Sequence, residues 1–424
     1  MNVLILGSGG RESAMAWKIA KSSKLTNLYC LPGNPGTEAV AKNLSGSVND
    51  KELIAKAVIE YAVDLVVVGP EDPLVLGLRD YFESKDELKD ILFVGPNAAG
   101  AALEGSKDFA KAFMAKYDVP TASYQSFTAE QIDDAREYLS GLQAPYVLKA
   151  DGLAAGKGVV IVNEIDEAVA ELKEMFSGKF GAAGNTVVIE EFLSGIELSV
   201  FVLTDGKDYM ILPEAKDYKR IMDGDQGLNT GGMGAVSPVP FADESFMDKV
   251  RAKVVEPTLK GLSQENIDYK GFIFIGLMNC QGEPYVIEYN VRMGDPETEA
   301  VMTRIESDFL AHLEAAAAGT LAQETLVVDP QKAVTIIAVS GGYPEEYKKG
   351  FEITGVENVE DALVFHAGTT KKDGVLLTNG GRVMAITANA TSLEEARELA
   401  YKEVARLNYQ GIFYRKDIAL DVMS

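Results

Sequence analysis

Cysteine, histidine, long apolar runs and positive charge are all scarce in this sequence. Cys30 and Cys280 are the only cysteines among 424 residues, which excludes a disulfide framework or a thiolate metal cluster and favours a reduced, cytoplasmic setting. The two histidines lie outside every motif described below, so histidine-based catalysis has no support. No run approaches the ~18 consecutive apolar residues of a membrane-spanning helix, and we expect no membrane partner.

Acidic residues greatly outnumber basic ones. The chain has 64 Asp and Glu against 40 Lys and Arg, a net charge of -24. Affinity for nucleic acid depends on clustered positive charge, so we expect no nucleic-acid partner. A small phosphorylated substrate is not excluded, because a few local cations can hold one. The length is typical of two to four domain-sized units.

The first hundred residues alternate apolar runs with amphipathic stretches. This alternation predicts a parallel sheet in an α/β, Rossmann-like unit. The predicted strands are 3–6, 64–68 and 91–94. The glycine-containing turns around them should share one ligand-facing edge of the sheet. These turns are 7–12, 32–34 and 69–71.

The first of these turns, GSGGRE, lies where backbone N–H groups can bind an anion. A dinucleotide site would also need an acid roughly 20 residues further on to hold the ribose. No acid occurs in that region before Glu38. We therefore favour a phosphate without nicotinamide, and a tight turn that only permits packing is the alternative.

A glycine-rich segment, 149–159, lies between two predicted strands. Gly156 and Gly158 let the backbone approach a polyphosphate, while Lys149 and Lys157 can neutralise its charge. The Walker A pattern is absent. A flexible basic hairpin tip without a ligand is the alternative interpretation.

Acidic residues follow the next predicted strand. Glu190 and Glu191 end it, and Glu197 follows six to seven residues later, after Leu193. Such a hinge could give an adenine ring an apolar slot and the ribose hydroxyls an acid. The signal is weak by itself, because a solvated acidic turn has the same composition.

The predicted strand 285–292 is the most informative one. Its two-residue period places Glu288, Asn290 and Arg292 on one face together with Val286. Carboxylate and amide oxygens suit magnesium, which takes few protein ligands plus nucleotide phosphates. Arg292 would then lie beside the transferring phosphoryl group. An exposed sheet face with a surface ion pair is the alternative.

Two further segments could meet a substrate. Residues 294–299, which include Asp295, look like a turn that caps the helix after it, with polar groups free to contact a substrate. Residues 217–220 and 229–235 predict a long loop between strands, and its glycine cluster could close over a ligand.

Taken together, these strings resemble the phosphoribosylamine–glycine ligases (glycinamide ribonucleotide synthetases) of the ATP-grasp superfamily. The resemblance extends over essentially the full length. The matching strings are GSGGRE, GPEDPLV, LEGSKDFAK, LKADGLAAGKGVV, IEEFLSGIELS, LNTGGMGAVSP and IEYNVRMGDPE. The last two separate these ligases from other ATP-grasp enzymes, such as biotin carboxylases, better than the nucleotide motifs do.

The resemblance implies an architecture and a reaction. The expected units are a pre-ATP-grasp domain at 1–102, an ATP-grasp domain at 103–325 with a lid at about 121–192, and a small mixed α/β domain at 326–424. In this family ATP phosphorylates the carboxylate of glycine. The amine of 5-phosphoribosylamine then attacks the acyl phosphate, which gives glycinamide ribonucleotide for purine synthesis. ATP with Mg²⁺ or Mn²⁺ is therefore expected, as are two small-molecule substrates and a monomer.

The resemblance also implies residue roles. The expected ATP contacts are Lys107, Lys149, Gly156, Lys157, Gly158, Glu190, Glu191, Leu193 and Glu197. The expected metal ligands are Glu288 and Asn290. The expected substrate contacts are Gly9, Gly10, Arg11, Glu12, Asp217, Lys219, Arg292 and Asp295, of which Arg292 and Asp295 are the candidates for catalysis.

Two positions depart from the family. Ser13 and Tyr218 stand where the family usually has histidine, and we expect altered substrate affinity rather than altered chemistry. Three other functions were weighed. These are another ATP-grasp carboxylate–amine ligase, a nicotinamide oxidoreductase suggested only by the first turn, and a non-catalytic nucleotide-binding module.

Overall fold

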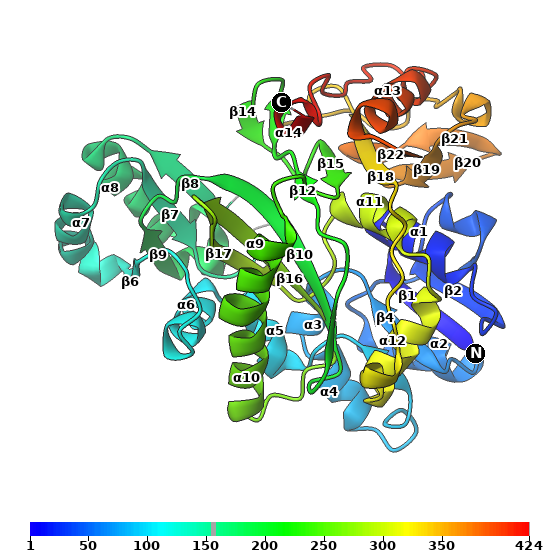
Figure 1. Cartoon of the computed structure of the whole chain (residues 1–424), viewed down its shortest axis with the longest axis horizontal. Helices are drawn as coiled ribbons and strands as arrows, with labels where there is room; N and C mark the ends of the chain where they lie inside the picture. The colour runs from blue at the N-terminus through cyan, green and yellow to red at the C-terminus, as the bar shows by residue number, and fades with distance from the viewer. Residues whose placement is uncertain (154–157, 424) are drawn as a thin grey trace.

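The chain begins with a parallel five-stranded sheet. The computed structural model describes residues 1–153 and 158–423 (Figure 1). Strand order in the first sheet is β3-β2-β1-β4-β5, and its apolar strands are buried between helices. The strands are β1 Asn2–Gly7, β2 Asn27–Pro32, β3 Lys42–Asn43, β4 Leu65–Val68 and β5 Leu92–Val94. The helices are α1 Gly10–Ile19, α2 Lys51–Glu60, α3 Asp72–Val75 and α4 Leu78–Glu83. The three predicted strands are confirmed.

The glycine turns meet at one edge of this sheet, as predicted. The backbone N–H of Gly33 donates to the Gly7 carbonyl at 3.1 Å. The Glu12 side chain fills the space between the turns, since a Cβ on Gly69 would lie 2.0 Å from Glu12 Oε1. Glycine is required there because the carboxylate approaches the backbone so closely.

The next unit is a lobe that extends to the left in Figure 1. Its antiparallel sheet has the order β6-β9-β7-β8. This sheet packs against α7 and α8 around a hydrophobic cluster of its own, which includes Phe127, Leu148 and Leu172. Two helices, α5 Ala98–Gly105 and α6 Lys107–Lys116, lead to this lobe. The elements of the lobe are β6 Tyr124–Thr128, α7 Ile132–Gly141, β7 Tyr146–Ala150, β8 Val159–Val162, α8 Ile165–Glu174, the π-helical turn η3 Met175–Lys179 and β9 Thr186–Glu190.

A second antiparallel sheet, of order β11-β10-β16-β17, lies at the centre. One of its faces carries apolar side chains, such as Val200, Ile275 and Tyr289, which are buried in a hydrophobic cluster. The other face is more polar and belongs to the candidate site. The elements are β10 Ile196–Thr204, β11 Tyr209–Ile211, α9 Glu244–Val250, the π-helical turn η5 Arg251–Val255, α10 Glu256–Gln264, β16 Gly271–Cys280 and β17 Glu283–Asn290.

A bulge in β17 corrects one prediction. Glu288 pairs with Gly276 and Val286 with Leu277, so Ile287 is an extra residue on this strand. The bulge turns Val286 into the same buried cluster as Tyr289. The predicted face shared by Val286 and Glu288 is therefore wrong, because strict alternation fails at the inserted residue. Glu288 and Asn290 lie beyond it and still share a face.

The third large sheet joins distant parts of the chain. Its order is β12-β15-β18-β22-β19, and β15 pairs with β18 about a hundred residues further on. The strands are β12 Lys216–Asp217, β15 Gly234–Ser237, β18 Lys332–Val339, β19 Leu363–His366 and β22 Arg382–Ala390. Two hairpins accompany it: β13 Arg220–Met222 with β14 Gln226–Asn229, and β20 Thr369–Lys372 with β21 Val375–Thr378. The helices are α11 Glu297–Arg304, α12 Phe309–Ala318, α13 Leu393–Val404 and α14 Leu420–Met423.

The prediction of one long loop over 217–235 is therefore wrong. Four short strands, β12 to β15, occupy this segment. Their hydrophobic pattern is too short to recognise, and β15 finds its partner far away in sequence.

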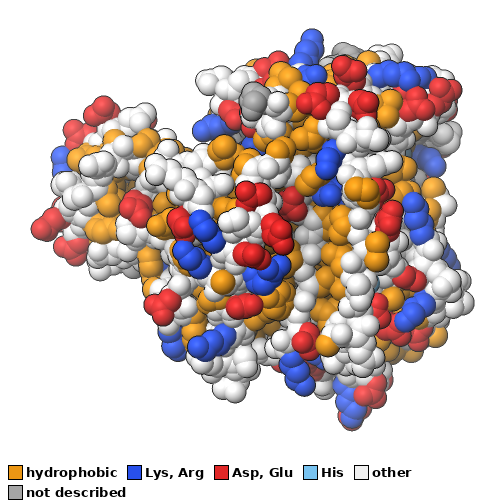
Figure 2. Space-filling view, viewed as in Figure 1, with side chains coloured by type: hydrophobic (Ala, Val, Ile, Leu, Met, Phe, Trp, Pro, Cys, Tyr) orange, Lys and Arg blue, Asp and Glu red, His pale blue; other side chains and the backbone are white. Residues whose placement is uncertain are grey.

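The surface shows mixed charge. Figure 2 shows acidic and basic side chains interspersed over the visible face. Among the described residues, the structure contains no helix whose length and hydropathy would allow it to span a membrane.

Candidate active site

The candidate site lies on the polar face of the central sheet. Ser199 on β10 and Glu288 on β17 both pair with Gly276 on the strand between them, so all three belong to one cross-strand row. Side chains two residues apart on a strand share a face, so Glu197 and Asn290 also lie on this side. A Cβ on Gly276 would lie 3.3 Å from Glu288 Cγ. A glycine in the middle strand thus leaves room beside the carboxylate.

Glu288 and Asn290 were predicted to bind a metal, and their placement fits such a role. They offer one carboxylate and one amide oxygen on the same strand face. Within the described ranges, no group of three or more Asp, Glu, His or Cys side chains is placed to hold a metal ion. This sparse donor set suits Mg²⁺, whose shell is usually completed by phosphate and water oxygens.

Three lysines lie at one end of this face, which we call the lysine end (Lys107, Lys111 and Lys149). Lys111 Nζ lies 3.0 Å from Glu190 Oε2, and Lys149 Nζ lies 2.9 Å from Glu190 Oε1. Lys111 and Lys149 are buried, whereas Lys107 is half-buried. Lys149 also donates to the carbonyl of the bulged Ile287 at 3.2 Å. The β17 bulge therefore fixes a lysine that was predicted to contact ATP.

Burial lowers the pKa of two lysines at this end, Lys107 and Lys111. It lowers the pKa of Lys111 to about 8, although Glu190 favours the charged form. Burial also lowers the pKa of Lys107, which donates to the Gly152 carbonyl at 2.9 Å. Asp151 accepts from the backbone N–H of Lys107 at 2.6 Å and so fixes the start of α6 against the hairpin. An arriving polyphosphate would stabilise the charged lysines.

The hairpin tip is only partly described. Gly156 and Lys157, both predicted ATP contacts, lie outside the described residues. The carbonyl of Gly158 accepts from the Ala150 backbone at 2.8 Å and so closes the hairpin between β7 and β8.

The hinge between β9 and β10 lies beside the lysine end. Glu191, a predicted ATP contact, accepts from the Ser123 backbone N–H at 2.9 Å and so ties the hinge to the segment before β6. Leu193 is half-buried, and the neighbouring Phe192 is 43% exposed. An exposed aromatic ring beside a fixed hinge offers an apolar surface for a flat ring.

A group of charged side chains lies near the start of β10. It consists of Glu197, Asp217 and Lys219. They line a small pocket together with Ser199 and Glu288. Lys219 Nζ donates to Glu197 Oε2 at 2.5 Å and holds the pKa of Glu197 below its usual value. Burial raises the pKa of Asp217, although Lys219 opposes this. Two residues predicted for substrate thus adjoin one predicted for ATP.

Three arginines form the opposite end of the site, which we call the arginine end (Arg11, Arg292 and Arg382). Arg292 Nε donates to Glu71 Oε2 at 3.2 Å, and its NH2 lies 2.8 Å from Glu104 Oε1. The other oxygen of Glu104 accepts from the Val291 backbone at 2.7 Å. Burial raises the pKa of Glu104 to about 7. Helix α5 therefore fixes both the side chain and the backbone next to Arg292.

The GSGGRE turn and Asp295 meet at this end. Arg11 donates to Glu12 Oε1 at 2.7 Å and to the Met293 carbonyl at 3.0 Å. Asp295 accepts from the Arg11 backbone at 3.4 Å and pairs with Arg382 at 3.1 Å. Burial would raise the pKa of Asp295, but Arg382 and Arg11 outweigh it, and its pKa lies below the usual value.

The helix after Asp295 begins as predicted, but without the expected cap. Its N-cap is Pro296, which offers no side-chain bond, and the acids of the turn are buried or paired rather than free. Glu297 accepts from Ser199 Oγ at 2.9 Å, and burial raises its pKa to about 7. Both carboxylate oxygens of Glu299 are buried and lack a hydrogen-bond partner among the described residues. A Cβ on Gly10 would lie 2.1 Å from Glu299 Oε1, so this carboxylate packs directly under the GSGGRE turn.

Comparison with known families finds matches over nearly the whole chain. Residues 1–104, 105–298 and 333–421 match the N domain, the ATP-grasp (A) domain and the C domain of phosphoribosylglycinamide synthetase. The chain belongs to the phosphoribosylglycinamide synthetase family.

Individual relatives are similar over their full lengths. The chain is 43% identical to the phosphoribosylamine–glycine ligase of Caldanaerobacter subterraneus subsp. tengcongensis, over 99% of both chains. It is 45% identical to that of Rhizobium meliloti, over 99% of this chain and 98% of the relative. The crystal structure of the phosphoribosylamine–glycine ligase from Thermotoga maritima superposes with a TM-score of 0.87 at 37% identity, covering 99% and 100% of the two chains.

A wider structural likeness shows the fold alone. The biotin carboxylase domain of the Hydrogenobacter thermophilus 2-oxoglutarate carboxylase, solved with MgADP, ADP and bicarbonate, superposes with a TM-score of 0.73 at 16% identity. The match covers 97% of this chain and 91% of that one. Residues 105–298 match an ATP-grasp domain, and the use of ATP by this chain rests on that family match.

The two departures from the family's usual histidines lie in different surroundings. Ser13 is 4% exposed on α1. Tyr218 is buried as well, and its hydroxyl donates to Asp421 Oδ1 at 2.6 Å near the end of the chain. Tyr218 thus points to the C-terminal segment, whereas its neighbours Asp217 and Lys219 line the pocket.

Sequence reasoning missed four charged residues that the structure brings to the candidate site. Lys111 lies one helical turn after Lys107, so their shared face on α6 could have revealed it. Glu71 and Glu104 occur inside the strings GPEDPLV and LEGSKDFAK but were given no role. Arg382 had no local signal, because its partner Asp295 lies 87 residues earlier.

Proposed function

We propose that this chain joins glycine to 5-phospho-D-ribosylamine at the expense of ATP. The products are glycinamide ribonucleotide, ADP and phosphate, which is an early step in making IMP. The observation that carries the proposal is full-length similarity, at 43% and 45% identity, to proteins named phosphoribosylamine–glycine ligase. The site geometry supports the same chemistry.

The lysine end is proposed to hold the nucleotide. Lys107, Lys111 and Lys149 converge beside the Glu288 face, where a triphosphate would meet their charges. The hinge at Glu191 and Leu193 would contact the adenine, and Glu197 would accept from the ribose hydroxyls. The loop that contains Gly156, Lys157 and Gly158 is proposed to cover the phosphates.

Glu288 and Asn290 are proposed to hold Mg²⁺ or Mn²⁺. When bound, the ion would neutralise phosphate charge during transfer. The chain itself supplies a carboxylate and an amide oxygen on a rigid strand, next to a glycine that leaves space.

Asp217 and Lys219 are proposed to bind glycine. Glycine at neutral pH carries one positive and one negative group, and the two side chains offer the complementary pair within one pocket. The pocket also contains Glu288, so the glycine carboxylate would lie beside the phosphoryl group it accepts. A carboxylate oxygen attacks the γ-phosphorus, the bond to the bridging oxygen breaks, and ADP leaves.

The arginine end is proposed to hold 5-phosphoribosylamine and to carry the second step. Gly9, Gly10, Arg11 and Glu12 form a turn at a helix N-terminus, which suits a phosphate. Asp295 is held ionised by Arg382 and Arg11, so it can accept a hydrogen bond from the amine. The amine attacks the carbonyl carbon of glycyl phosphate, the C–N bond forms, phosphate leaves, and the nitrogen loses a proton. Arg292 would stabilise the charge on the phosphoryl group.

We further propose that the chain works as a monomer in the cytoplasm. Both of its cysteines are free thiols, which fits a reducing compartment. The proposed division of the chain is 1–102, 103–325 and 326–424, with a lid at about 121–192 that is supported by the separate hydrophobic cluster of that lobe.

The test is ADP release by the purified protein with Mg²⁺, ATP, glycine and freshly generated 5-phosphoribosylamine, omitting each in turn. We expect ADP only when both substrates are present, together with glycinamide ribonucleotide in the product mixture. ADP release that is indifferent to 5-phosphoribosylamine would contradict the proposed acceptor and favour another ATP-grasp carboxylate–amine ligase.

A further inference from the structure

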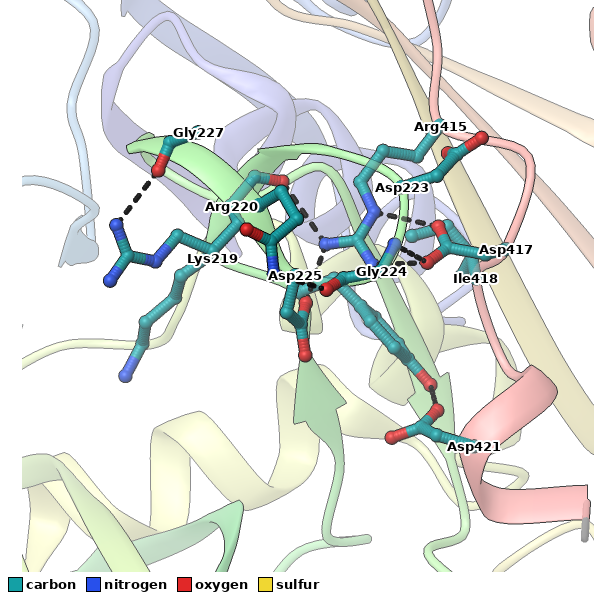
Figure 3. A network of polar contacts seen from close by, with 12 residues as sticks. Lys219, Arg220, Asp223, Gly224, Asp225, Gly227, Arg415, Asp417, Ile418 and Asp421 are labelled. Atoms are coloured by element: carbon teal, nitrogen blue, oxygen red, sulfur yellow. Dashed lines mark hydrogen bonds and ion pairs between the residues drawn. The ribbon is translucent and has the colours of Figure 1, made fainter.

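The segment 216–219, which begins as strand β12, has two functional sides. Asp217 and Lys219 point into the pocket with Glu197. Lys216 and Tyr218 alternate with them and contact the C-terminal segment instead. Figure 3 shows Arg415 and Asp417 of this segment beside residues 219–225. We call residues 415–421 the C-terminal clasp.

Tyr218 is the central contact of the clasp. Its hydroxyl donates to Asp421 Oδ1 at 2.6 Å and accepts from the Ala419 backbone N–H at 3.0 Å. Lys216 Nζ lies 3.6 Å from the centre of the Tyr218 ring and 3.0 Å from Asp421 Oδ2. Tyr218 and Lys216 are both buried. A buried hydroxyl with two hydrogen-bond partners fixes the direction of the Tyr218 side chain and therefore the orientation of the backbone that carries it.

Arg415 is the second anchor, and it is only 1% exposed. Its NH1 donates to Asp225 Oδ1 at 2.8 Å and to the Arg220 carbonyl at 3.1 Å. The rest of the guanidinium makes a two-point contact with Asp417, at 2.8 and 2.7 Å. A planar guanidinium with this many partners fixes both the distance and the relative orientation of the two segments that it joins.

Two further bonds extend the clasp over the β13–β14 hairpin. The Gly224 backbone N–H donates to Asp417 Oδ2 at 2.7 Å, and the Lys416 N–H donates to Asp223 Oδ1 at 2.8 Å. The hairpin is otherwise exposed along β14. Ile221 of β13 is buried in a hydrophobic core, so the clasp and this one side chain together hold the segment after Lys219.

We propose that the C-terminal clasp is a positioning element for glycine binding. By fixing Tyr218 and the carbonyl of Arg220, it sets the orientation of Asp217 and Lys219 in the pocket. The inference rests on the proposed function, because it assigns the glycine subsite of that reaction. The clasp residues act through the strand and are positioning residues.

The first test compares Tyr218→Phe with Tyr409→Phe. Tyr409 is a matched control: its buried hydroxyl donates to the Val339 carbonyl at 3.0 Å within the same C-terminal part of the chain. We expect Tyr218→Phe to raise the KM for glycine about fivefold, equivalent to about 1 kcal/mol, with kcat and the KM for ATP little changed. Tyr409→Phe should leave all three constants near wild type. An unchanged glycine KM in Tyr218→Phe, or equal changes in both variants, would overturn the proposal.

The second test uses Arg415. Arg415→Met should raise the glycine KM further, and Arg415→Lys should recover part of the loss, because a lysine keeps the charge but not the fork. Amide hydrogen exchange of 216–230 should be faster in Tyr218→Phe than in wild type or Tyr409→Phe. Equal exchange in all three proteins would contradict positioning by the clasp, whether or not Arg415→Met folds.

Failure of the two proposals can be told apart. Wild-type protein that releases no ADP with glycine and 5-phosphoribosylamine would refute the proposed function and, with it, the assignment to glycine. Active wild type with an unmoved glycine KM in Tyr218→Phe would refute the clasp alone.

Discussion

The lysine end and the arginine end of the candidate site hold positive charge in different ways. At the lysine end, Lys111 and Lys149 share a single carboxylate, Glu190. At the arginine end, Arg292 alone has two carboxylate partners, Glu71 and Glu104. One end thus has an excess of cations, and the other is already neutralised by the protein.

This difference suits the lysine end to attracting an anionic ligand and the arginine end to aligning one. Burial lowers the pKa of Lys111 to about 8 because one carboxylate cannot offset the lost hydration of two ammonium groups. Such a site gains most when an anion arrives. The guanidinium of Arg292 is fixed by a fork of contacts before any ligand binds, which favours geometry in a transition state over affinity. We therefore expect the lysine end to control the KM for ATP and the arginine end to control kcat.

The largest effect is expected for Arg292→Lys. A lysine keeps the charge but cannot contact Glu71 and Glu104 while also facing a phosphoryl group, so kcat should fall by about 100-fold or more. The measurement is steady-state ADP release at saturating substrates. Arg251→Lys, which alters an arginine whose side chain is 45% exposed, is the control and should be near wild type. A kcat for Arg292→Lys close to that of the control would break the comparison.

A smaller effect is expected for Lys149→Met. Loss of a charge-assisted contact should raise the KM for ATP about tenfold, while kcat at saturating ATP changes little. The control is Lys116→Met, because Lys116 is exposed on α6 and pairs with Glu265. A fall in kcat with an unchanged KM for ATP would show that the two ends do not divide their roles in this way.

The smallest effect is expected for Glu299→Gln, and it concerns stability. Burial raises the pKa of Glu299 well above its usual value, so the folded state keeps a proton that the unfolded state loses above about pH 4.3. The carboxyl therefore costs stability increasingly as pH rises above that value. An amide avoids this cost, and we expect Tm to rise by about 2 °C at pH 8, with a smaller rise at pH 5.

The matched control for this change is Glu398→Gln, on the exposed side of α13. Thermal unfolding of both variants at the two pH values is the measurement. An increase in Tm that is equal at pH 5 and pH 8 would show that Glu299 does not act through its proton.

Local patterns predicted the strands that end at the site. Each of these strands is a short, largely apolar run with a turn signal at one end, which is typical of a strand buried on both faces. The runs are 3–6, 146–149 and 186–189, and they lie within β1, β7 and β9. The pair Glu288 and Asn290 could be predicted because two polar residues in alternate positions of a buried strand require partners.

Features that depend on distant partners could not be predicted. The bulge at Ile287 is set by pairing with β16, and the Arg382–Asp295 contact joins residues 87 positions apart. Strand β12 has two residues, so its pattern carries no period. Tyr218 stands between the predicted substrate contacts Asp217 and Lys219, but its hydroxyl binds Asp421 of the C-terminal segment instead.

The antiparallel sheet β12-β15-β18-β22-β19 has a consequence for how the chain can be divided. Strand β15 pairs with β18 over four consecutive residues, from Gly234↔Ile336 to Ser237↔Ala333. A fragment ending near residue 325 would leave the β15 edge without its neighbour, and an unpaired apolar edge recruits other chains. If the chain is expressed as two fragments, we therefore expect a folded protein only when both fragments are present and β15 of one pairs with β18 of the other.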